Sequence, residues 1–391
     1  MDRAEQRTVV HSGDLHLGGS SLRPEGGNSA ETRFQVFQDL LELCRSEGAD
    51  VLLLAGDVLE QDALAPASLS RVLTLLGGLA AEGVEIFITP GNHDAATPLS
   101  PYRDAGLWPE GVHVLVEPET VALPELGLSV SGAGFRSLYQ RQPLLPLLSA
   151  VYESARSAGE LEGCPLALAL LHGDLRHGPG GLYNPIDPLD IAASPFAYLA
   201  LAHIHQPDHE IRKAGSCRYA FCGTTQGASR LDEGPRGCYV LKFTDGRWDS
   251  ARFVDLAATV YRNVAVELQK PENVEQAARQ CIAKLREAAL AEDEERQVVY
   301  YMTLHGFSAG SYLPDPEILQ SRLEAEGYVF SGLLDRTSPE MDPAKLEEED
   351  SLRGLFYRSL SRQAARAAAE DQQLCERALR LGMDAFRSEL L

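Results

Sequence analysis

Short apolar runs in this sequence end at side chains that could bind metal ions. Five motifs follow such runs: Asp14-Leu15-His16, Gly56-Asp57, Gly91-Asn92-His93-Asp94, His172 and His203-Ile204-His205. Each run has the length and apolar character of a strand buried on both faces. Because ligands gather at the carboxyl ends of strands in an α/β sheet, we expect these side chains to converge on one point.

The candidate ligands combine two carboxylates, one amide oxygen and four imidazoles. They are Asp14, Asp57, Asn92, His16, His172, His203 and His205. This mixture suits Mn, Fe or Zn better than Ca or Mg. Seven ligands are too many for one tetrahedral ion, whereas two ions sharing a carboxylate would use them all and leave room for a bridging hydroxide and substrate oxygens. Such a centre would carry roughly +1 charge, which favours an anionic phosphodiester as substrate.

Each motif alone has an ordinary structural explanation. Asp-x-His is usually a turn with a capping aspartate, Gly-Asp a strand-to-helix turn, and His-x-His a strand with one exposed face. These explanations would need five independent turns to carry ligands at five successive strand ends, and a metal site accounts for all five at once. His113, His209 and His305 have no such neighbours, so we interpret them as surface or core histidines.

The elements that position these motifs can be read from the periodicity. Apolar runs at residues 8–11, 51–55, 86–89, 166–171 and 198–201 predict buried strands, and the spacing in 31–46 and 68–82 predicts amphipathic helices. Further runs at 112–116, 126–130, 218–221 and 238–243 predict a second, mostly antiparallel sheet packed on the first. We therefore expect a layered α/β domain over residues 1–256.

The pattern changes beyond residue 256. Alternating strand and helix patterns predict a small α/β cap domain over residues 257–340, and residues 341–391 are predicted to be helical. Leu352, Leu355 and Phe356 lie on one apolar stripe of this C-terminal segment. Such a stripe could pack on the chain's own cap domain or bind a partner protein.

The composition limits the classes of function. The net charge is −22, from 57 acidic and 35 basic residues, whereas proteins that hold nucleic acid by overall charge are usually basic. A polyanion site must therefore be local, built from arginines, metal ions or a basic partner. No apolar run reaches the roughly 18 residues of a membrane span, and the N-terminal residues lack a signal-peptide pattern. Seven cysteines without CxxC spacing predict reduced thiols, so the cytoplasm is the expected location.

In this combination the sequence resembles the calcineurin-like metallophosphoesterase superfamily, and its spacing is similar to that of the SbcD-type and YhaO-type DNA repair exonucleases. Residues 198–207, Tyr-Leu-Ala-Leu-Ala-His-Ile-His-Gln-Pro, are the most specific part. The resemblance implies a four-layer α-β-β-α sandwich with a small α/β cap domain and C-terminal helices. Ala202 departs from the glycine that the superfamily usually has there. Glu60 stands where archaeal and eukaryotic members place a second catalytic histidine.

The resemblance also implies roles for the residues. One ion would be held by Asp14, His16, Asp57 and His205, and the other by Asp57, Asn92, His172 and His203. His93 would face the scissile phosphate, and Asp94 would fix the orientation of its imidazole. A protein phosphatase is disfavoured because Gly-Asp continues as Val58-Leu59-Glu60-Gln61.

The predicted function is a two-metal, manganese-dependent DNA exonuclease with 3'-5' polarity, to which single-strand endonuclease activity could be added. The expected partners are DNA and a coiled-coil SMC-like ATPase of the SbcC or YhaN type, gripped by the C-terminal helices, and a second copy of the chain is a further candidate. Arginines on loops near the motifs are candidates for phosphate contacts: Arg23, Arg136, Arg141, Arg176 and Arg230. Two other functions stay open, a phosphoesterase for small nucleotides and a weakly catalytic DNA-end clamp for an ATPase.

Overall fold

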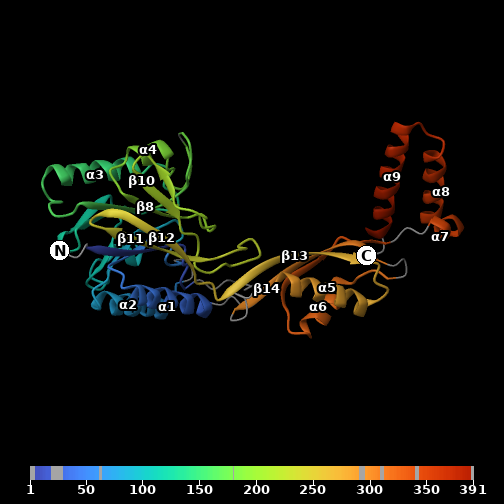
Figure 1. Ribbon diagram of the computed structural model, residues 1–391, viewed down its shortest axis with the longest axis horizontal. Coiled ribbons are helices and arrows are strands. Elements are labelled where there is room, and N and C mark those ends of the chain that lie inside the picture. The colour runs from blue at the N-terminus through green and yellow to red at the C-terminus, as the bar shows by residue number, and fades with distance from the viewer. Residues whose placement is uncertain are drawn as a thin grey trace. The chain divides into compact units, whose positions relative to one another are not determined.

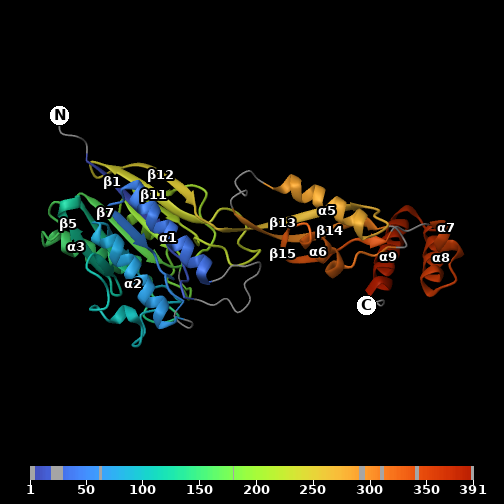
Figure 2. The same ribbon diagram turned by 90° about the horizontal axis from the view of Figure 1, so that it is seen from below.

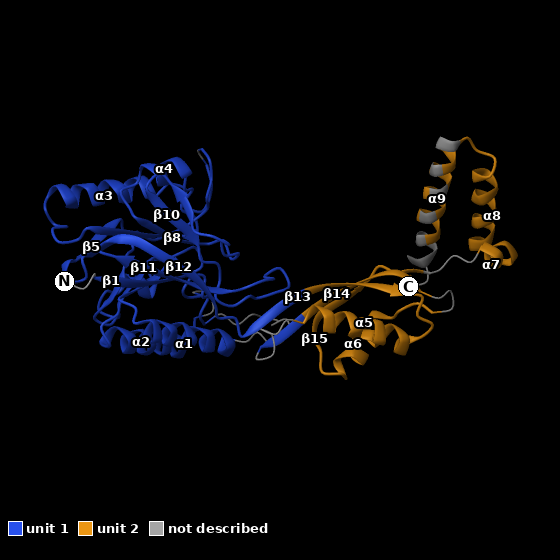
Figure 3. Cartoon of the chain, viewed as in Figure 1, with its two compact units in different colours: residues 1–262, 292–299 blue, residues 263–291, 300–391 orange. Residues whose placement is uncertain are grey.

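The computed structural model describes residues 5–18, 30–60, 64–178, 180–289, 296–308, 312–339 and 343–388. The chain divides into two compact units (Figure 3). The first contains residues 1–262 and 292–299, and the second contains residues 263–291 and 300–391. In the described part of the chain, we find no helix with the length and apolar character needed to cross a membrane.

The first sheet of the first unit has six strands in the order β12-β11-β1-β2-β3-β4. They are β1 (Gln6–Ser12), β2 (Val51–Leu54), β3 (Glu85–Ile88), β4 (Val112–Val114), β11 (Gly237–Thr244) and β12 (Arg247–Asp255). Strands β1 to β4 are parallel, and β11 runs antiparallel to both β1 and β12. Helices α1 (Ala30–Glu47) and α2 (Pro66–Ala81) form the crossovers that parallel strands require.

The second sheet has the order β5-β6-β7-β8-β10-β9. Its strands are β5 (Glu119–Leu123), β6 (Leu128–Ala133), β7 (Leu166–His172), β8 (Tyr198–Ala202), β9 (Arg212–Ala214) and β10 (Cys217–Phe221). The four central strands are parallel, and the edge strands β5 and β9 are antiparallel to their neighbours. The prediction of a mostly antiparallel second sheet was therefore wrong, as was the placement of residues 112–116 and 238–243 in it. The runs at 166–171 and 198–201, expected in the first sheet, form β7 and β8 of the second. Helix α3 (Leu145–Ser157) lies in the crossover from β6 to β7 and helix α4 (Pro188–Ala193) in that from β7 to β8, whereas the connection from β8 to β10 contains β9.

Alternation along the strands explains the layers of this unit. Val10 of β1 and Leu52 of β2 pack against α1 and α2, whereas Val9 and Val51 face the core between the two sheets. A third core lies between the second sheet and helices α3 and α4. Figure 1 shows the helix pairs on the outer faces of the two sheets, and Figure 2 shows α1 and α2 side by side. The predicted α-β-β-α fold class is confirmed.

A smaller sheet of order β13-β14-β15, with β16 paired to β14, belongs mostly to the second unit, although residues 259–262 of β13 and 297–299 of β14 are part of the first. The elements of this region are β13 (Thr259–Gln269), α5 (Val274–Ala288), β14 (Gln297–Ser308), α6 (Pro316–Glu324), β15 (Val329–Asp335) and β16 (Ser338–Pro339). Three helices follow: α7 (Pro343–Glu348), α8 (Leu352–Ala364) and α9 (Ala369–Ser388). Helices α8 and α9 pack against each other. On α8, Leu352 and Leu355 are 71% and 59% exposed, so the described part of the chain leaves most of both side chains uncovered.

Candidate metal centre

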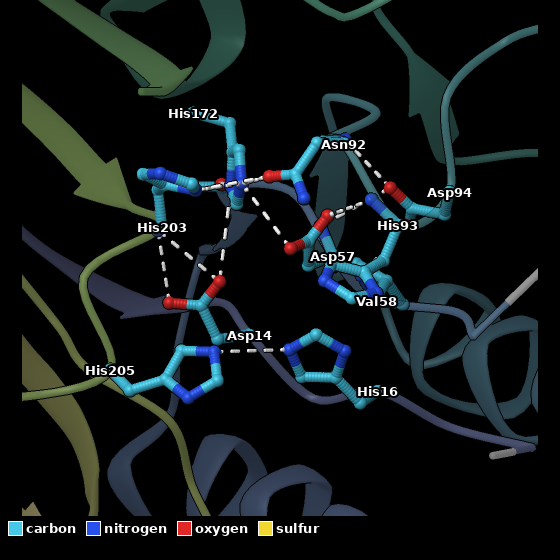
Figure 4. Close-up of polar contacts among 12 residues, drawn as sticks. Asp14, His16, Asp57, Val58, Asn92, His93, Asp94, His172, His203 and His205 are labelled. Atoms are coloured by element: carbon cyan, nitrogen blue, oxygen red, sulfur yellow. Dashed lines mark hydrogen bonds and ion pairs between the residues drawn. The ribbon is translucent and has the colours of Figure 1, made fainter. Parts of the chain in front are cut away.

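The seven predicted ligands lie in one connected cluster at the carboxyl ends of strands from both sheets (Figure 4). β1 leads to Asp14 and His16, β2 to Asp57, and β3 to Asn92. β7 ends on His172, and β8 leads to His203 and His205. Facing strand ends of two packed sheets thus bring together side chains that are distant in the sequence.

Tight backbone turns direct these side chains into the cluster. Asp14, His16 and Asp57 have φ values of 48°, 49° and 50°, a left-handed conformation that costs about 1–2 kcal/mol for residues with a Cβ atom. Gly56 has φ +95°, and a Cβ atom there would lie 2.5 Å from Nδ1 of His172. Glycine at this position lets the β2 turn approach the β7 histidine closely.

One half of the cluster contains Asn92, His172 and His203 beside Asp57. Oδ1 of Asn92 lies 3.0 Å from Nε2 of His172 and 3.0 Å from Nδ1 of His203. These two ring nitrogens are 3.2 Å apart. Oδ2 of Asp57 lies 3.3 Å from Nε2 of His172. Four potential donor atoms for a metal therefore point at one small volume.

The other half contains Asp14, His16 and His205. The Nε2 atoms of His16 and His205 face each other at 3.3 Å, and the backbone N–H of His203 donates to the Asp14 carboxylate at 3.0 Å. The donor atoms of Asp14, His16 and His205 lie within 4.8 Å of one another, as do those of Asp57, His172 and His203. Asp57 also groups with His16 and His93, so its carboxylate lies between the two halves.

Hydrogen bonds on the outer ring nitrogens test whether this cluster fits metal ions. Nδ1 of His172 donates to the carbonyl of Ala55 at 3.0 Å, and Nδ1 of His16 donates to Oε2 of Glu60 at 3.0 Å. Nε2 of His203 lies 3.2 Å from Oδ1 of Asp174. Each of these imidazoles thus directs its other nitrogen, with a lone pair, into the cluster. Lone pairs facing one another at about 3 Å need positive charge between them, so the residues fit divalent cations.

The buried carboxylates create the same demand for positive charge. Burial lowers the pKa of His172, but the Asp57 and Asp14 carboxylates and the Ala55 carbonyl together outweigh this effect and raise the pKa to about 9. The shift shows that the ring nitrogen beside Asp57 lies in a strongly negative environment. Divalent cations would supply that charge in place of the proton.

The two predicted catalytic residues occupy different environments. The side chain of His93 is 47% exposed, and its Nδ1 lies 3.0 Å from Oε1 of Glu60. The carboxylate of Asp94 is buried and accepts hydrogen bonds from the N–H groups of segment 57–59 and from Gly91 and Tyr102. We expected Asp94 to contact the His93 imidazole, but Glu60 makes this contact instead. Asp94 instead joins two loops, because the chain leaving β2 presents N–H groups that need an acceptor.

Several residues around the centre were missed by the sequence reasoning. Asp174 orients His203, and two arginines hold the backbone of ligands: Arg33 donates to the His16 carbonyl at 3.0 Å and Arg236 to the His205 carbonyl at 2.8 Å. Arg236 is only 1% exposed. The position of Asp174, two residues after His172, was a usable signal, whereas the spacing of the arginines gives none.

The centre also has aromatic and open surroundings. The ring centroid of Tyr183 lies 4.9 Å from that of His203 and 5.9 Å from that of Tyr139, which is 46% exposed. A pocket of about 760 Å³ adjoins the His203-Ile204-His205 motif and is lined by Asp174, Arg176, Ile204 and Gln206, among others.

The other arginines and histidines considered in the sequence analysis lie at several places in the structure. Arg136 pairs with Glu117 at 3.2 Å, and Arg23 lies outside the described residues. His113 contacts Glu85 on the neighbouring strand, His209 lines the pocket, and His305 belongs to β14 of the second unit.

Comparisons with known proteins agree with this geometry. The family model for calcineurin-like phosphoesterases matches residues 7–207. The chain is 28% identical to the uncharacterized metallophosphoesterase YhaO of Bacillus subtilis (strain 168), over 68% of this chain and 64% of YhaO. It is 26% identical to the DNA double-strand break repair protein Mre11 of Methanopyrus kandleri, over 53% of this chain and 46% of Mre11. It is 25% identical to the SbcD component of the nuclease SbcCD of Escherichia coli (strain K12), over 64% of this chain and 68% of that protein.

The matches span less than two thirds of YhaO and of Mre11. The family model, however, covers more than half of the 391 residues and includes every predicted ligand. The predicted superfamily and its SbcD-type and YhaO-type relatives are confirmed. The chain therefore belongs to the calcineurin-like phosphoesterase family.

Proposed function

We propose that this protein is a DNA exonuclease acting in DNA repair, with 3'-5' polarity and the capacity to cut single strands internally. The observation that carries the proposal is the two-part cluster around Asp57, with the half-exposed His93 beside it. Relatives named as a nuclease component and a double-strand break repair protein support the choice of DNA as substrate.

Two divalent ions, manganese by our expectation, would be held by the seven ligands. Asp14, His16 and His205 would hold one and Asn92, His172 and His203 the other, with Asp57 shared. When bound, the ions would neutralise phosphate charge and activate water for attack on phosphorus at neutral pH.

The protein's own groups would position the reaction. Nδ1 of His93 faces Glu60, so its Nε2 is directed away from that contact, and in the protonated imidazolium form this nitrogen can give its proton to the leaving oxygen. The backbone N–H of His93 donates to Oδ1 of Asp57 at 2.8 Å, which fixes the histidine relative to the centre. Asp94 supports both residues by joining their loops.

The surroundings favour a nucleic acid as substrate. Tyr183 lies against His203, and the exposed Tyr139 lies next to Tyr183. Bases of an unpaired strand stack on such aromatic faces, each with about 1–3 kcal/mol of binding free energy. A strand end whose phosphate reaches the cluster could place a base on this pair.

The pocket beside the cluster favours a second candidate, a phosphoesterase for small nucleotides. Its volume of about 760 Å³ falls within the range of small-molecule sites, and it carries both acidic and basic side chains. This function needs no aromatic track and no partner.

The C-terminal helices are the proposed partner-binding element. Leu352 and Leu355 on α8 and Leu374 and Leu381 on α9 are more than half exposed. We infer that residues 341–391 bind a coiled-coil SMC-like ATPase, because one relative is named as one component of a nuclease with more than one subunit. A second copy of the chain is the alternative occupant. A DNA substrate and the seven unpaired cysteines agree with the expected cytoplasmic location.

Digestion of end-labelled duplex and single-stranded DNA with Mn²⁺ tests the proposal. We expect cleavage that a chelator abolishes and that His93→Ala strongly reduces. Turnover of a cyclic mononucleotide at a rate unaffected by DNA competitor, with labelled DNA left intact, would establish the small-substrate function instead. The variant Asp57→Asn separates a catalytic from a structural role. If it loses both cleavage and assembly with the partner, the protein is a DNA-end clamp. If it loses cleavage alone, the protein is a nuclease.

A further inference from the structure

Glu60 lies between two histidines to which we have given different tasks. Its Oε2 accepts a hydrogen bond from Nδ1 of His16 at 3.0 Å, and its Oε1 lies 3.0 Å from Nδ1 of His93. The rings of His16 and His93 meet edge to face, with centroids 4.8 Å apart. One carboxylate thus contacts a candidate metal ligand and the candidate proton donor at the same time.

The backbone places Glu60 at this point. The segment after β2 runs beside the segment after β1: Leu17 N–H donates to the Val58 carbonyl at 2.9 Å, and Glu60 N–H donates to the Leu17 carbonyl at 2.9 Å. His16 N–H donates to the Asp57 carbonyl at 2.9 Å in the same ladder. The side chain of Glu60 is 23% exposed, so it is partly shielded from water.

We propose that Glu60 is a shared positioning residue that sets the tautomers of both His16 and His93. A carboxylate only accepts hydrogen bonds, so it requires an N–H at Nδ1 of each ring. His16 then presents the lone pair of Nε2 to the metal cluster. His93 presents Nε2 to the substrate side, where the ring can donate to the leaving oxygen only when it is protonated on both nitrogens. This inference rests on the proposed function for the His93 arm only.

Glutamine at position 60 separates this role from simple packing. Glu60→Gln preserves the shape of the side chain, but one of its two oxygens becomes an NH2 group that cannot accept a hydrogen bond. Only one of the two histidines can then keep its tautomer, whichever way the amide turns. Glu60→Ala removes both contacts, and Glu60→Asp keeps the charge on a shorter side chain that cannot span both rings at 3.0 Å. Glu162→Gln, at an exposed position after α3, is the matched control.

The experiment measures Mn²⁺ binding by titration calorimetry and the kinetics of bis(p-nitrophenyl) phosphate and labelled DNA hydrolysis in the full chain. In Glu60→Gln and Glu60→Ala we expect one of two quantities to fall: the Mn²⁺ affinity at one site, or kcat at saturating Mn²⁺. The expected loss is about 10- to 100-fold, which is the usual effect of removing a carboxylate that supports a metal ligand. The loss in kcat should occur with KM changed by less than about threefold. Adding Glu60→Gln to His93→Ala should slow the enzyme no further at saturating Mn²⁺, because the kinetic effect passes through His93.

Two results would overturn the inference. Wild-type Mn²⁺ affinity and kcat in Glu60→Gln and Glu60→Ala would show that the carboxylate positions neither ring. Kinetic losses of Glu60→Gln and His93→Ala that multiply in the double variant would show that Glu60 does not act through His93. If the glutamine variant fails to fold, Glu60→Asp takes its place, with the same loss expected. The Mn²⁺ titration uses no DNA, so it tests the positioning role independently of the nuclease proposal. If the protein leaves DNA intact but the Glu60 variants bind Mn²⁺ more weakly, the nuclease proposal is rejected and the positioning role is still supported.

Discussion

Replacing Asp94 by asparagine tests how the loops that carry Asp57 and Asn92 are held together. Oδ1 of Asp94 accepts the N–H groups of Gly91 at 2.6 Å and of Asp57 at 3.2 Å. Its Oδ2 accepts hydrogen bonds from Val58 N–H at 2.8 Å, Leu59 N–H at 3.1 Å and the Tyr102 hydroxyl at 2.8 Å. Asparagine offers one acceptor oxygen and an NH2 group that accepts nothing. In its better orientation it still leaves the N–H groups of Gly91 and Asp57 without an acceptor.

The expected magnitude follows from these two lost acceptors. A buried donor left unsatisfied costs about 1–3 kcal/mol, so Asp94→Asn should lower the free energy of unfolding by about 2–6 kcal/mol. That is a large part of the roughly 5–15 kcal/mol typical of a folded domain. The variant should also bind Mn²⁺ more weakly, because the Asp57 and Asn92 loops lose their common anchor.

Urea unfolding followed by tryptophan fluorescence measures this loss. The sequence has two tryptophans, Trp108 and Trp248, both in the first unit, and the Trp108 ring stacks on Tyr102 with centroids 5.2 Å apart. The signal therefore reports the unit that contains Asp94. Asp249→Asn, at an exposed position of β12, is the control and should be neutral. A loss below about 1 kcal/mol in Asp94→Asn would refute the reasoning, because ordinary surface substitutions cost up to about half that.

Three further predictions concern the centre and its surroundings. A Cβ atom at Gly91 would lie 2.2 Å from Oδ1 of Asp57, so Gly91→Ala should weaken Mn²⁺ binding in a calorimetric titration, whereas Gly78→Ala, with nothing within 4 Å, should not. Tyr183→Ala should raise KM for single-stranded DNA by about tenfold, as expected for losing 1–3 kcal/mol of base stacking, while Tyr183→Phe stays near wild type; equal losses on bis(p-nitrophenyl) phosphate would contradict the stacking role. His11 contacts Tyr198, and burial lowers its pKa from 6.5 to about 3. Between these two pH values the His11 imidazole is protonated in the unfolded chain and neutral in the folded chain. Unfolding free energy should therefore fall as the pH drops below 6.5, by about 1.4 kcal/mol per pH unit from this group, and His11→Gln should flatten the wild-type slope in urea titrations between pH 7 and 5.

The fold layers and the convergence of the ligands could be predicted because both depend on strong local signals. Buried strands such as residues 166–171 are apolar throughout, and a polar side chain directly after such a strand stands out. The direction and membership of the second sheet could not be predicted this way. An apolar run has the same pattern in a parallel and an antiparallel pair, and the helices α3 and α4, which mark β6, β7 and β8 as parallel, lie outside these runs.

Contacts between loops were also beyond the sequence pattern. The link from Glu60 to His16 and His93 depends on the pairing of the segments after β1 and β2, which no periodicity encodes. The same holds for Asp94, whose partners are mostly backbone N–H groups of segment 57–59. Spacing identifies which residues can do chemistry, whereas their orientation depends on hydrogen bonds that form only in the folded chain.

The chain has a net charge of −22, so as a whole it repels a polyanion, and the attraction must come from a local source of positive charge. Arg33 and Arg236 lie next to the centre, but their guanidinium groups donate to the carbonyls of His16 and His205 and so serve to hold ligands. Arg136 is paired with Glu117. Under the proposed function, bound cations would supply positive charge for a phosphodiester at this site, and Arg176 on the adjoining pocket and a basic partner surface would add to it. On this argument the metal ions serve substrate binding as well as chemistry, and removing them should weaken the affinity for DNA even where no cleavage is measured.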